Sequence, residues 1–306
     1  MSALLTPDLL RRLEQFQLLA ARRAKSSAKG ERRSRARGQS VEFADYRSYV
    51  AGDDFRHLDW NLYGRLDRLF LKLYEEEREL PVRIFLDASE SMSFGEPRKF
   101  DFARQIAAAV GYVALCGFDR VSVIPFPNVT NGEGQAMTSE EAAARGALRA
   151  VRGKKSSLQF FRNLSAVTAR GPANLNDALR RGAFEARQAG VAIVLSDFLD
   201  PAGYESGITA LVGRGFQVNA VQILAPDETA PSTFGDLRLV DSETGGLQEV
   251  TFGKFRLKHY QQTVQNFIQR LREFCTTRGA NFFMAGSDTD LQDLLLKQLR
   301  AAEVWG

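Results

Sequence analysis

The chain has little of the side-chain chemistry on which most hydrolases and metalloproteins depend. It contains two cysteines and two histidines among 306 residues. Cys116 and Cys275 lie far apart in predicted helices, which is typical of reduced thiols and not of a disulfide framework. No apolar run approaches the roughly 20 residues of a membrane-spanning helix, and the N-terminus lacks a signal-peptide pattern. We therefore expect a cytoplasmic protein.

Several motifs of nucleotide-binding proteins and of hydrolases are also incomplete. Gly153–Ser156 (G-K-K-S) lacks the glycine that a phosphate-binding loop needs five residues before its Gly-Lys pair. The run from Gly132 to Gly134 does not complete a dinucleotide fingerprint. His57 precedes Leu58-Asp59, but no Gly-x-Ser-x-Gly elbow accompanies it, so we interpret it as a packed histidine. The chain is not expected to bind ATP by itself.

Positive charge is concentrated in one segment. Arg22 to Arg37 holds eight Lys or Arg against the single Glu31, a local charge of +7 in a chain whose net charge is +4, so the remainder carries −3. The segment contains no aromatic residue on which a nucleic-acid base would stack. A solvated linker is the favoured interpretation; contact with an anionic membrane surface is an alternative, and specific nucleic-acid binding is not expected.

Strand and helix patterns alternate along most of the chain, and 44% of its residues are hydrophobic, enough for a substantial core. Strands are expected at 69–79, 82–86, 120–126, 191–195, 217–224 and 280–285, and helices at 6–23, 97–116, 139–152, 157–168, 175–188, 204–214, 255–277 and 290–302. This order predicts an α/β fold, a three-layer doubly wound and mostly parallel sheet. Residues 237–240 and 247–251 flank a Gly-Gly turn and predict a β-hairpin.

Three regions follow from these patterns. Residues 1–37 form an N-terminal helix and the basic arm, residues 38–80 a charged and aromatic collar, and residues 81–306 the α/β domain, with the hairpin inserted near 236–252. In the collar, five rings are expected to be buried within a web of paired charges: Tyr46, Tyr49, Phe55, Trp60 and Tyr63. A partner-binding surface is the alternative interpretation of the collar.

Polar residues follow two of the buried strands. Asp87, Ser89 and Ser91 come after the strand at 82–86, and Asp197 follows the strand at 191–195. The carboxyl ends of parallel strands share one edge of a sheet, which brings these hydroxyls and carboxylates together. They are hard oxygen ligands of the kind that Mg²⁺ prefers. A second interpretation stays open: the two aspartates cap the sheet edge and the serines bond loop amides.

The Asp-x-Ser-x-Ser pattern resembles the metal-ion-dependent adhesion site of the von Willebrand factor A domain. More narrowly, the stretches Phe43 to Trp60 (F-A-D-Y-R-S-Y-V-A-G-D-D-F-R-H-L-D-W), Glu75 to Val82 and Val194 to Phe198 resemble domain-of-unknown-function family 58. That resemblance implies a bacterial or archaeal protein that works with a MoxR-type AAA+ ATPase. One position departs from the adhesion-site pattern: Ala173 stands where the pattern has a metal-binding threonine, and Ala173 has no ligating atom.

These features support two main hypotheses. The first is a non-enzymatic protein-interaction module, an adaptor between a MoxR-type ATPase and client proteins, which docks partners at the carboxyl edge of the sheet. The second is a Mg²⁺-dependent phosphoryl-transfer hydrolase with Asp87 as nucleophile. The hydrolase is disfavoured because Ser89 stands where the haloacid-dehalogenase-type motif has an acidic proton donor, and a hydroxyl of high pKa is a poor acid.

Overall fold

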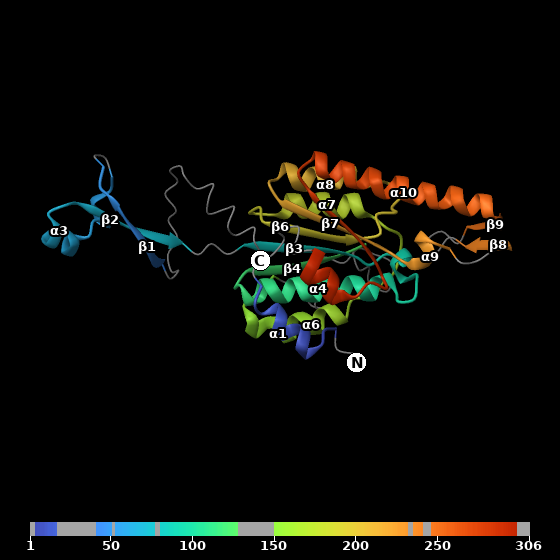
Figure 1. The fold of residues 1–306 in the computed structure, drawn as a ribbon, viewed down its shortest axis with the longest axis horizontal. Coiled ribbons are helices and arrows are strands. Elements are labelled where there is room, and N and C mark those ends of the chain that lie inside the picture. Colours follow the sequence, from blue (N-terminus) through green and yellow to red (C-terminus); the bar gives the residue numbers. More distant parts are fainter. Residues whose placement is uncertain are drawn as a thin grey trace. The chain divides into compact units, whose positions relative to one another are not determined.

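The computed structural model describes residues 4–16, 41–50, 53–76, 80–127, 150–231, 235–240 and 246–298. The chain divides into two compact units, one made of Met1–Arg23 with Leu80–Gly306 and the other of Ala24–Glu79 (Figure 1). The basic arm at 22–37 and most of the helix predicted at 139–152 lie outside the described residues. No helix within the described ranges combines the length and apolar character needed to cross a membrane.

A six-stranded sheet forms the centre of the larger unit. Its strand order is β10-β7-β6-β3-β4-β5, and all neighbours are parallel except β4 and β5. The strands are β3 (Pro81–Asp87), β4 (Arg120–Phe126), β5 (Val151–Arg152), β6 (Val191–Ser196), β7 (Gln217–Leu224) and β10 (Asn281–Gly286). The predicted α/β architecture with a mostly parallel sheet is confirmed.

The order of the strands reverses beside β3. The chain passes from β3 outward to β4, then returns to β6 on the other side of β3 and continues to β7 and β10. In open parallel sheets, the crevice at such a switch point is where ligands and partners usually bind. All six residues of β6 and five of the seven residues of β3 are buried, as expected for strands covered on both faces.

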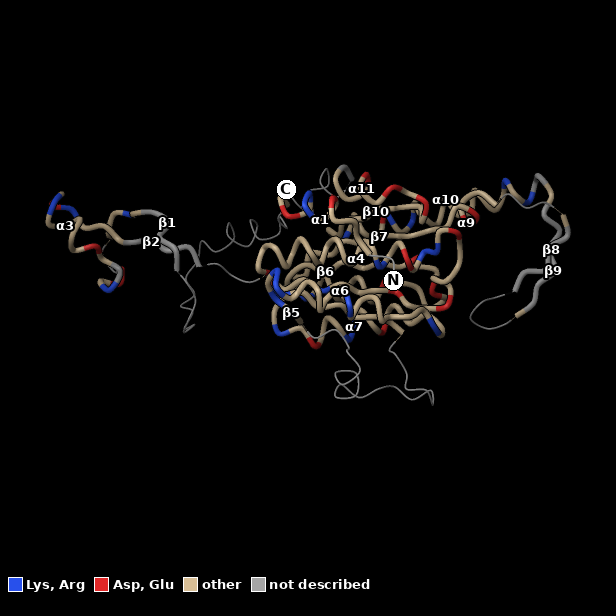
Figure 2. The backbone as a smooth tube through the Cα atoms, turned by 90° about the horizontal axis from the view of Figure 1, so that it is seen from below, with Lys and Arg blue, Asp and Glu red and all other residues tan. Residues whose placement is uncertain are grey.

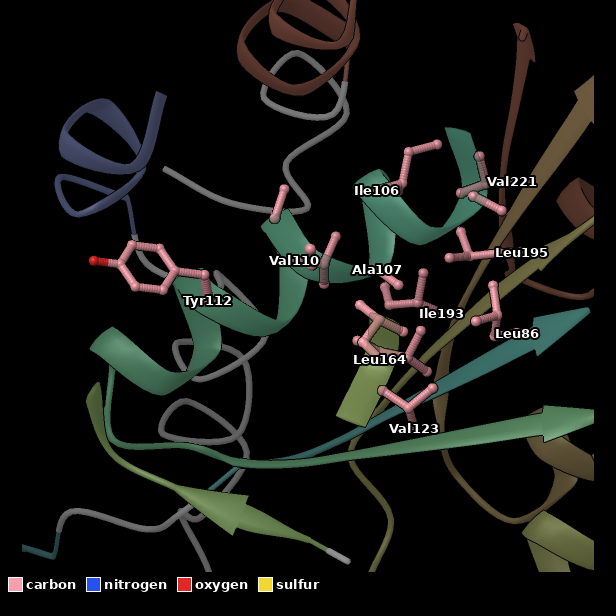
Figure 3. Close-up of a cluster of buried hydrophobic side chains, with 14 of the residues drawn as sticks. Leu86, Ile106, Ala107, Val110, Tyr112, Val123, Leu164, Ile193, Leu195 and Val221 are labelled. Carbon is pink, nitrogen blue, oxygen red and sulfur yellow. The ribbon is translucent and has the colours of Figure 1, made fainter. Parts of the chain in front are cut away.

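Helices cover both faces of the sheet (Figure 1). One face carries α4 (Lys99–Cys116), together with α1 (Pro7–Leu13) and α6 (Ser157–Ser165). Figure 3 shows Ala107 of α4 beside Ile193 of the sheet, and Ile106, Leu86 and Leu195 belong to the same buried cluster. The predicted apolar face of this helix is therefore the face that it buries.

The opposite face is covered by α7 (Leu175–Glu185), α8 (Glu205–Gly213) and α10 (Lys254–Thr277). Phe85 and Phe126 of the sheet pack into this second core together with Phe198, which lies just beyond β6. Figure 2 shows Lys and Arg interspersed with Asp and Glu along the backbone of the larger unit. The remaining elements are η2 (Glu90–Ser93), η3 (Lys154–Ser156), α9 (Pro226–Thr229), α11 (Leu291–Asp293), η4 (Leu294–Gln298) and the antiparallel pair β8 (Gly235–Val240) and β9 (Leu247–Phe252).

Three predicted helices differ from the structure. The first helix ends at Leu13, well before Arg23, because its last turn tightens: Gln15 N–H bonds the Arg12 carbonyl and Phe16 N–H bonds the Leu13 carbonyl. Residues 151–152, predicted as the end of a helix, instead extend the sheet as β5. The last predicted helix consists of α11 and the π-helical turn η4 over the described residues 291–298.

In the smaller unit, β1 (Val41–Ser48) pairs antiparallel with β2 (Phe70–Glu76), and η1 (Phe55–His57) and α3 (Trp60–Leu66) connect them. The prediction of buried rings is wrong here. Phe55 and Trp60 are 60% and 63% exposed, Tyr46 and Tyr63 are also exposed, and Tyr49 is half-buried. A two-stranded sheet and a seven-residue helix offer too little surface to cover five rings.

Candidate functional site

The two aspartates predicted from the sequence meet at the switch point of the sheet. Asp87 is the last residue of β3, and Asp197 directly follows β6, the strand beside it, with Leu86 in register with Leu195. Ser89 and Ser91 lie in the loop and 3₁₀ turn that leave β3. The structure therefore brings all four predicted site residues together, while their role as metal ligands stays a prediction.

Both carboxyl oxygens of Asp87 are bonded within the protein. Oδ1 accepts hydrogen bonds from the Ser89 hydroxyl at 2.6 Å and from the Ser89 N–H at 2.9 Å. Oδ2 accepts the Ser196 hydroxyl of the neighbouring strand at 2.5 Å. Asp87 is 1% exposed. The Ser89 and Ser91 hydroxyls therefore bond carboxyl groups and each other, and not loop amides as the second sequence interpretation assumed.

Three oxygen-to-oxygen contacts join Asp87 to Asp197 through the two serines. They measure 2.6 Å from Asp87 to Ser89, 3.0 Å from Ser89 to Ser91 and 3.0 Å from Ser91 to Asp197. The Ser89 hydroxyl donates to Asp87 and the Ser91 hydroxyl donates to Asp197, so each hydroxyl bonds a carboxyl oxygen. The two serine hydroxyls thus link the two carboxyl groups across the ends of β3 and β6.

The environment of Asp87 raises the pKa of its carboxyl group. Burial is the main cause that raises its pKa, and the negative charge of Asp197 raises it further. The hydrogen bonds from Ser196 and Ser89 act in the opposite direction but do not restore the ordinary value, and the pKa of Asp87 is about 7. Asp87 is thus a carboxyl group that titrates near neutral pH.

A lysine that the sequence interpretation did not include completes the site. Lys99, in the first turn of α4, is fully buried, and its Nζ lies 2.7 Å from Asp197 Oδ2 and 2.6 Å from Glu228 Oε1. Burial lowers the pKa of Lys99, but the charges of the two carboxylates and their hydrogen bonds outweigh this and raise the pKa overall. Lys99 is therefore a charged ammonium group inside the site.

The loop that resembles the threonine position of the adhesion site also lies close by. Arg170 N–H bonds the Ala88 carbonyl and Glu90 N–H bonds the Gly171 carbonyl, so this loop runs beside the serine loop. Ala173 offers no side-chain oxygen, and Asn174 Oδ1 is buried without a hydrogen-bond partner. A divalent cation bound beside Ser91 and Asp197 would face the Lys99 ammonium, which already bonds the same Asp197 oxygen. The donor set does not fit Mg²⁺ while Lys99 holds its present position.

Two signals in the sequence point to the residues that were missed. Lys99 precedes Ala103, Ile106 and Val110 at helical spacing, so it lies on the apolar face of α4, where a lysine must find negative partners. Ser196 is the residue before Asp197 at the end of a buried strand. Glu228 carried no comparable signal, because its approach to Lys99 depends on the tertiary fold.

Comparison with known sequences identifies the family. The profile described as protein of unknown function DUF58 matches residues 45–267 of this chain. The chain belongs to the DUF58 family. Among curated relatives, the uncharacterized proteins Mb1516 of Mycobacterium bovis and Rv1480 of Mycobacterium tuberculosis are each 27% identical to this DUF58 protein over 252 residues, covering 79% of this chain and 74% of the relative.

Two solved structures also align with this DUF58 protein. The conserved hypothetical protein BatB of Bacteroides thetaiotaomicron aligns with a TM-score of 0.42 and 13% identity, covering 73% of this chain and 98% of BatB. An aerotolerance-related membrane protein of Bacteroides fragilis aligns with a TM-score of 0.42 and 16% identity, covering 74% of this chain and 98% of that protein.

Burial limits what the site residues do directly. Asp87, Ser89 and Asp197 are at most 2% exposed, and among the four predicted residues only Ser91 is half-buried. A nucleophilic Asp87 would need a free carboxylate oxygen that the substrate can reach, whereas both oxygens accept hydrogen bonds inside the protein. The geometry therefore favours a buried network that fixes the surrounding loops over a group that touches a partner or substrate itself.

Proposed function

We propose that this DUF58 protein is a non-enzymatic protein-interaction module that docks its partners at the carboxyl edge of the sheet. In this proposal the buried network holds the loops after β3 and β6 in one conformation, and the outer side chains of these loops make the contacts. The position at the switch point of the sheet supports this role, because loops that meet there combine residues from distant parts of the chain.

The observation that carries the proposal is a pair of exposed apolar side chains on the two loops. Phe94, just after η2, is 50% exposed, and Leu199, after Asp197, is 47% exposed. Both residues are tied to the network: Phe94 N–H bonds the Ser91 carbonyl and Leu199 N–H bonds Asp197 Oδ1. Exposed apolar side chains held on rigid loops are typical of protein-binding surfaces.

The partner we propose is a MoxR-type AAA+ ATPase, with the client proteins of that ATPase. This choice rests on the resemblance of Phe43 to Trp60 and Val194 to Phe198 to a family that is often encoded beside such ATPases. We propose in addition that the larger unit is a von Willebrand factor A-like domain, with β8 and β9 as an inserted hairpin, and that the protein acts in the cytoplasm.

The test is a binding measurement between the full-length protein and the MoxR-type ATPase of the same organism, by biolayer interferometry. A Phe94→Ser and Leu199→Ser double variant is expected to raise the Kd at least about tenfold, because two exposed anchors are lost. The matched control is a Leu158→Ser and Phe184→Ser double variant. These residues are 69% and 81% exposed and belong to α6 and to the C-terminal end of α7, outside the two loops.

Equal Kd values for wild type and the loop variant would contradict docking at this edge. Loss of binding in the control as well would show that the contact surface lies elsewhere. The hydrolase alternative is assayed on the same preparations: phosphate release from an aryl phosphate by wild type, abolished in Asp87→Asn, would overturn the non-enzymatic proposal.

A further inference from the structure

Lys99 occupies a buried position in which an unpaired charge would strongly destabilise the protein. Its side chain is fully buried, between the apolar face of α4 and the carboxyl edge of the sheet. Transfer of an ammonium group out of water is costly, and it persists in a protein interior only with close negative partners. The residues around Lys99 must therefore supply the negative charge that a buried cation needs.

The partners of Lys99 include the same oxygen that binds the serine chain. Asp197 Oδ2 accepts the Lys99 ammonium at 2.7 Å and the Ser91 hydroxyl at 3.0 Å. The other aspartate oxygen, Oδ1, accepts the Leu199 N–H. Both oxygens of Asp197 are thus bonded to protein donors, and the ammonium lies where a cation beside Ser91 and Asp197 would have to lie.

Glu228 supplies a second carboxylate from the same chain. It lies in α9, directly after β7, and Oε1 accepts the Lys99 ammonium at 2.6 Å while Oε2 accepts the Ala225 N–H at 2.7 Å. Tyr260 of α10 donates its hydroxyl to the Glu228 backbone carbonyl at 2.9 Å, which ties α9 to α10. Glu228 is therefore held in place from two sides.

We propose that the Lys99 ammonium is the resident cation of this site and that Glu228 is its acidic ligand. In a metal-dependent adhesion site, a divalent ion and the acidic side chain of a partner would have these two roles. Here the chain itself provides both, so the carboxyl edge is assembled without a divalent metal. This inference deepens the proposed function, because it makes the docking edge independent of Mg²⁺.

The first test uses Mn²⁺ as the probe and the full-length wild-type protein, with free Mn²⁺ followed by electron paramagnetic resonance. No saturable site with a Kd below about 1 mM is expected. Mg²⁺ is likewise expected to leave the thermal unfolding midpoint unchanged. One Mn²⁺ bound per chain with a micromolar Kd, and lost in Asp197→Asn, would overturn the inference.

A second test removes the ammonium. Lys99→Ala leaves Asp197, Glu228 and Ser91 around a space without a cation, so this variant is expected to gain one Mn²⁺ site and to be stabilised by Mn²⁺. The control is Lys154→Ala, which removes an exposed lysine paired with Glu14 and is expected to gain no site. A folded Lys99→Ala chain that binds no Mn²⁺ would contradict the assigned position of the ammonium.

If Lys99→Ala does not fold, Mn²⁺ binding to the Glu228→Ala variant tests the inference instead. This variant opens the edge but retains the ammonium, so it is expected to bind no Mn²⁺, and a gained Mn²⁺ site would overturn the inference. Binding to the ATPase, measured in chelator and in Mg²⁺, separates this inference from the proposed function. Absence of ATPase binding in both buffers contradicts the docking role alone, whereas binding that requires Mg²⁺ contradicts the resident cation alone.

Discussion

The Ser196 hydroxyl lies 2.5 Å from Asp87 Oδ2 and joins the ends of β6 and β3, the two strands at the switch point of the sheet. Ser196 Oγ also accepts the Phe198 N–H at 2.9 Å, where the backbone takes the left-handed conformation with φ 61°. A single buried hydroxyl thus satisfies a carboxyl oxygen and the amide of the turn that places Asp197.

Ser196→Ala is therefore expected to destabilise the protein by about 1–3 kcal/mol, because a buried acceptor and a buried amide lose their partner together. Urea unfolding measures the change. Ser122→Ala is the matched control: Ser122 is half-buried on β4, and its hydroxyl contacts the Val82 carbonyl only at 3.5 Å, so about 0.5 kcal/mol or less is expected. Equal losses of unfolding free energy in the two variants would show that the Ser196 hydrogen bonds stabilise the protein no more than the long Ser122 contact does.

The raised pKa of Asp87 predicts a specific pH dependence of stability. An unfolded aspartate has a pKa of about 3.9, and burial beside Asp197 raises that of Asp87 to about 7. Between these values the folded state binds more protons than the unfolded state, so the free energy of unfolding falls as pH rises from about 4 to about 7. The full loss from this group is at most about 4 kcal/mol.

Asp87→Asn isolates this contribution, since asparagine stays neutral at every pH in the window. The difference in unfolding free energy between the variant and wild type is expected to shift in favour of the variant from pH 4 to pH 7. Urea titrations at half-unit intervals measure it. A difference that stays constant across the window would mean that Asp87 is ionised throughout and that burial beside Asp197 does not raise its pKa.

Periodicity predicted the parts of the fold in which burial follows local pattern. All six residues of β6 are apolar or small and buried, and the apolar spacing of α4 matches its buried face. The meeting of Asp87 with Asp197 followed from one rule, that carboxyl ends of neighbouring parallel strands share an edge. These inferences needed only the order of elements and not their detailed packing.

The interactions that were missed depend on tertiary geometry. Glu228 reaches Lys99 across 129 positions of sequence, and nothing local to Pro226–Thr229 distinguishes it from an ordinary helix start. The prediction that the rings of the smaller unit are buried was wrong for a related reason. Aromatic residues such as Trp60 predict burial on average, but whether enough surface exists to cover them is a property of the assembled unit.

Close packing between α4 and α6 predicts a sharp response at one glycine. A Cβ added at Gly111 would overlap the Phe160 ring, and Phe160 is 1% exposed. Gly111→Ala is expected to destabilise by about 1–3 kcal/mol even though alanine favours the helix, because overpacking outweighs helix propensity.

The control for this prediction is Gly213→Ala in α8, where an added Cβ meets nothing within 4 Å. That change is expected to be neutral or to stabilise by up to about 1 kcal/mol, through helix propensity. Thermal unfolding followed by circular dichroism compares the two variants. A Gly111→Ala midpoint equal to or above that of wild type would mean that the contact between the two helices relaxes freely.

The two cysteines are expected to differ in reactivity, because the thiolate is the reactive species and burial opposes its formation. Burial raises the pKa of Cys275 to about 12, and Cys275 is fully buried between α10 and the sheet. Cys116 is only half-buried at the end of α4, although burial raises its pKa as well.

A disulfide reagent applied to the native protein should modify Cys116 first, as followed by mass spectrometry. The Cys116→Ser variant should retain one slowly reacting thiol, that of Cys275, which reacts fully only after unfolding in urea. Faster labelling of Cys275 would show that the C-terminal half of α10 separates from the sheet more often than the rest of the core.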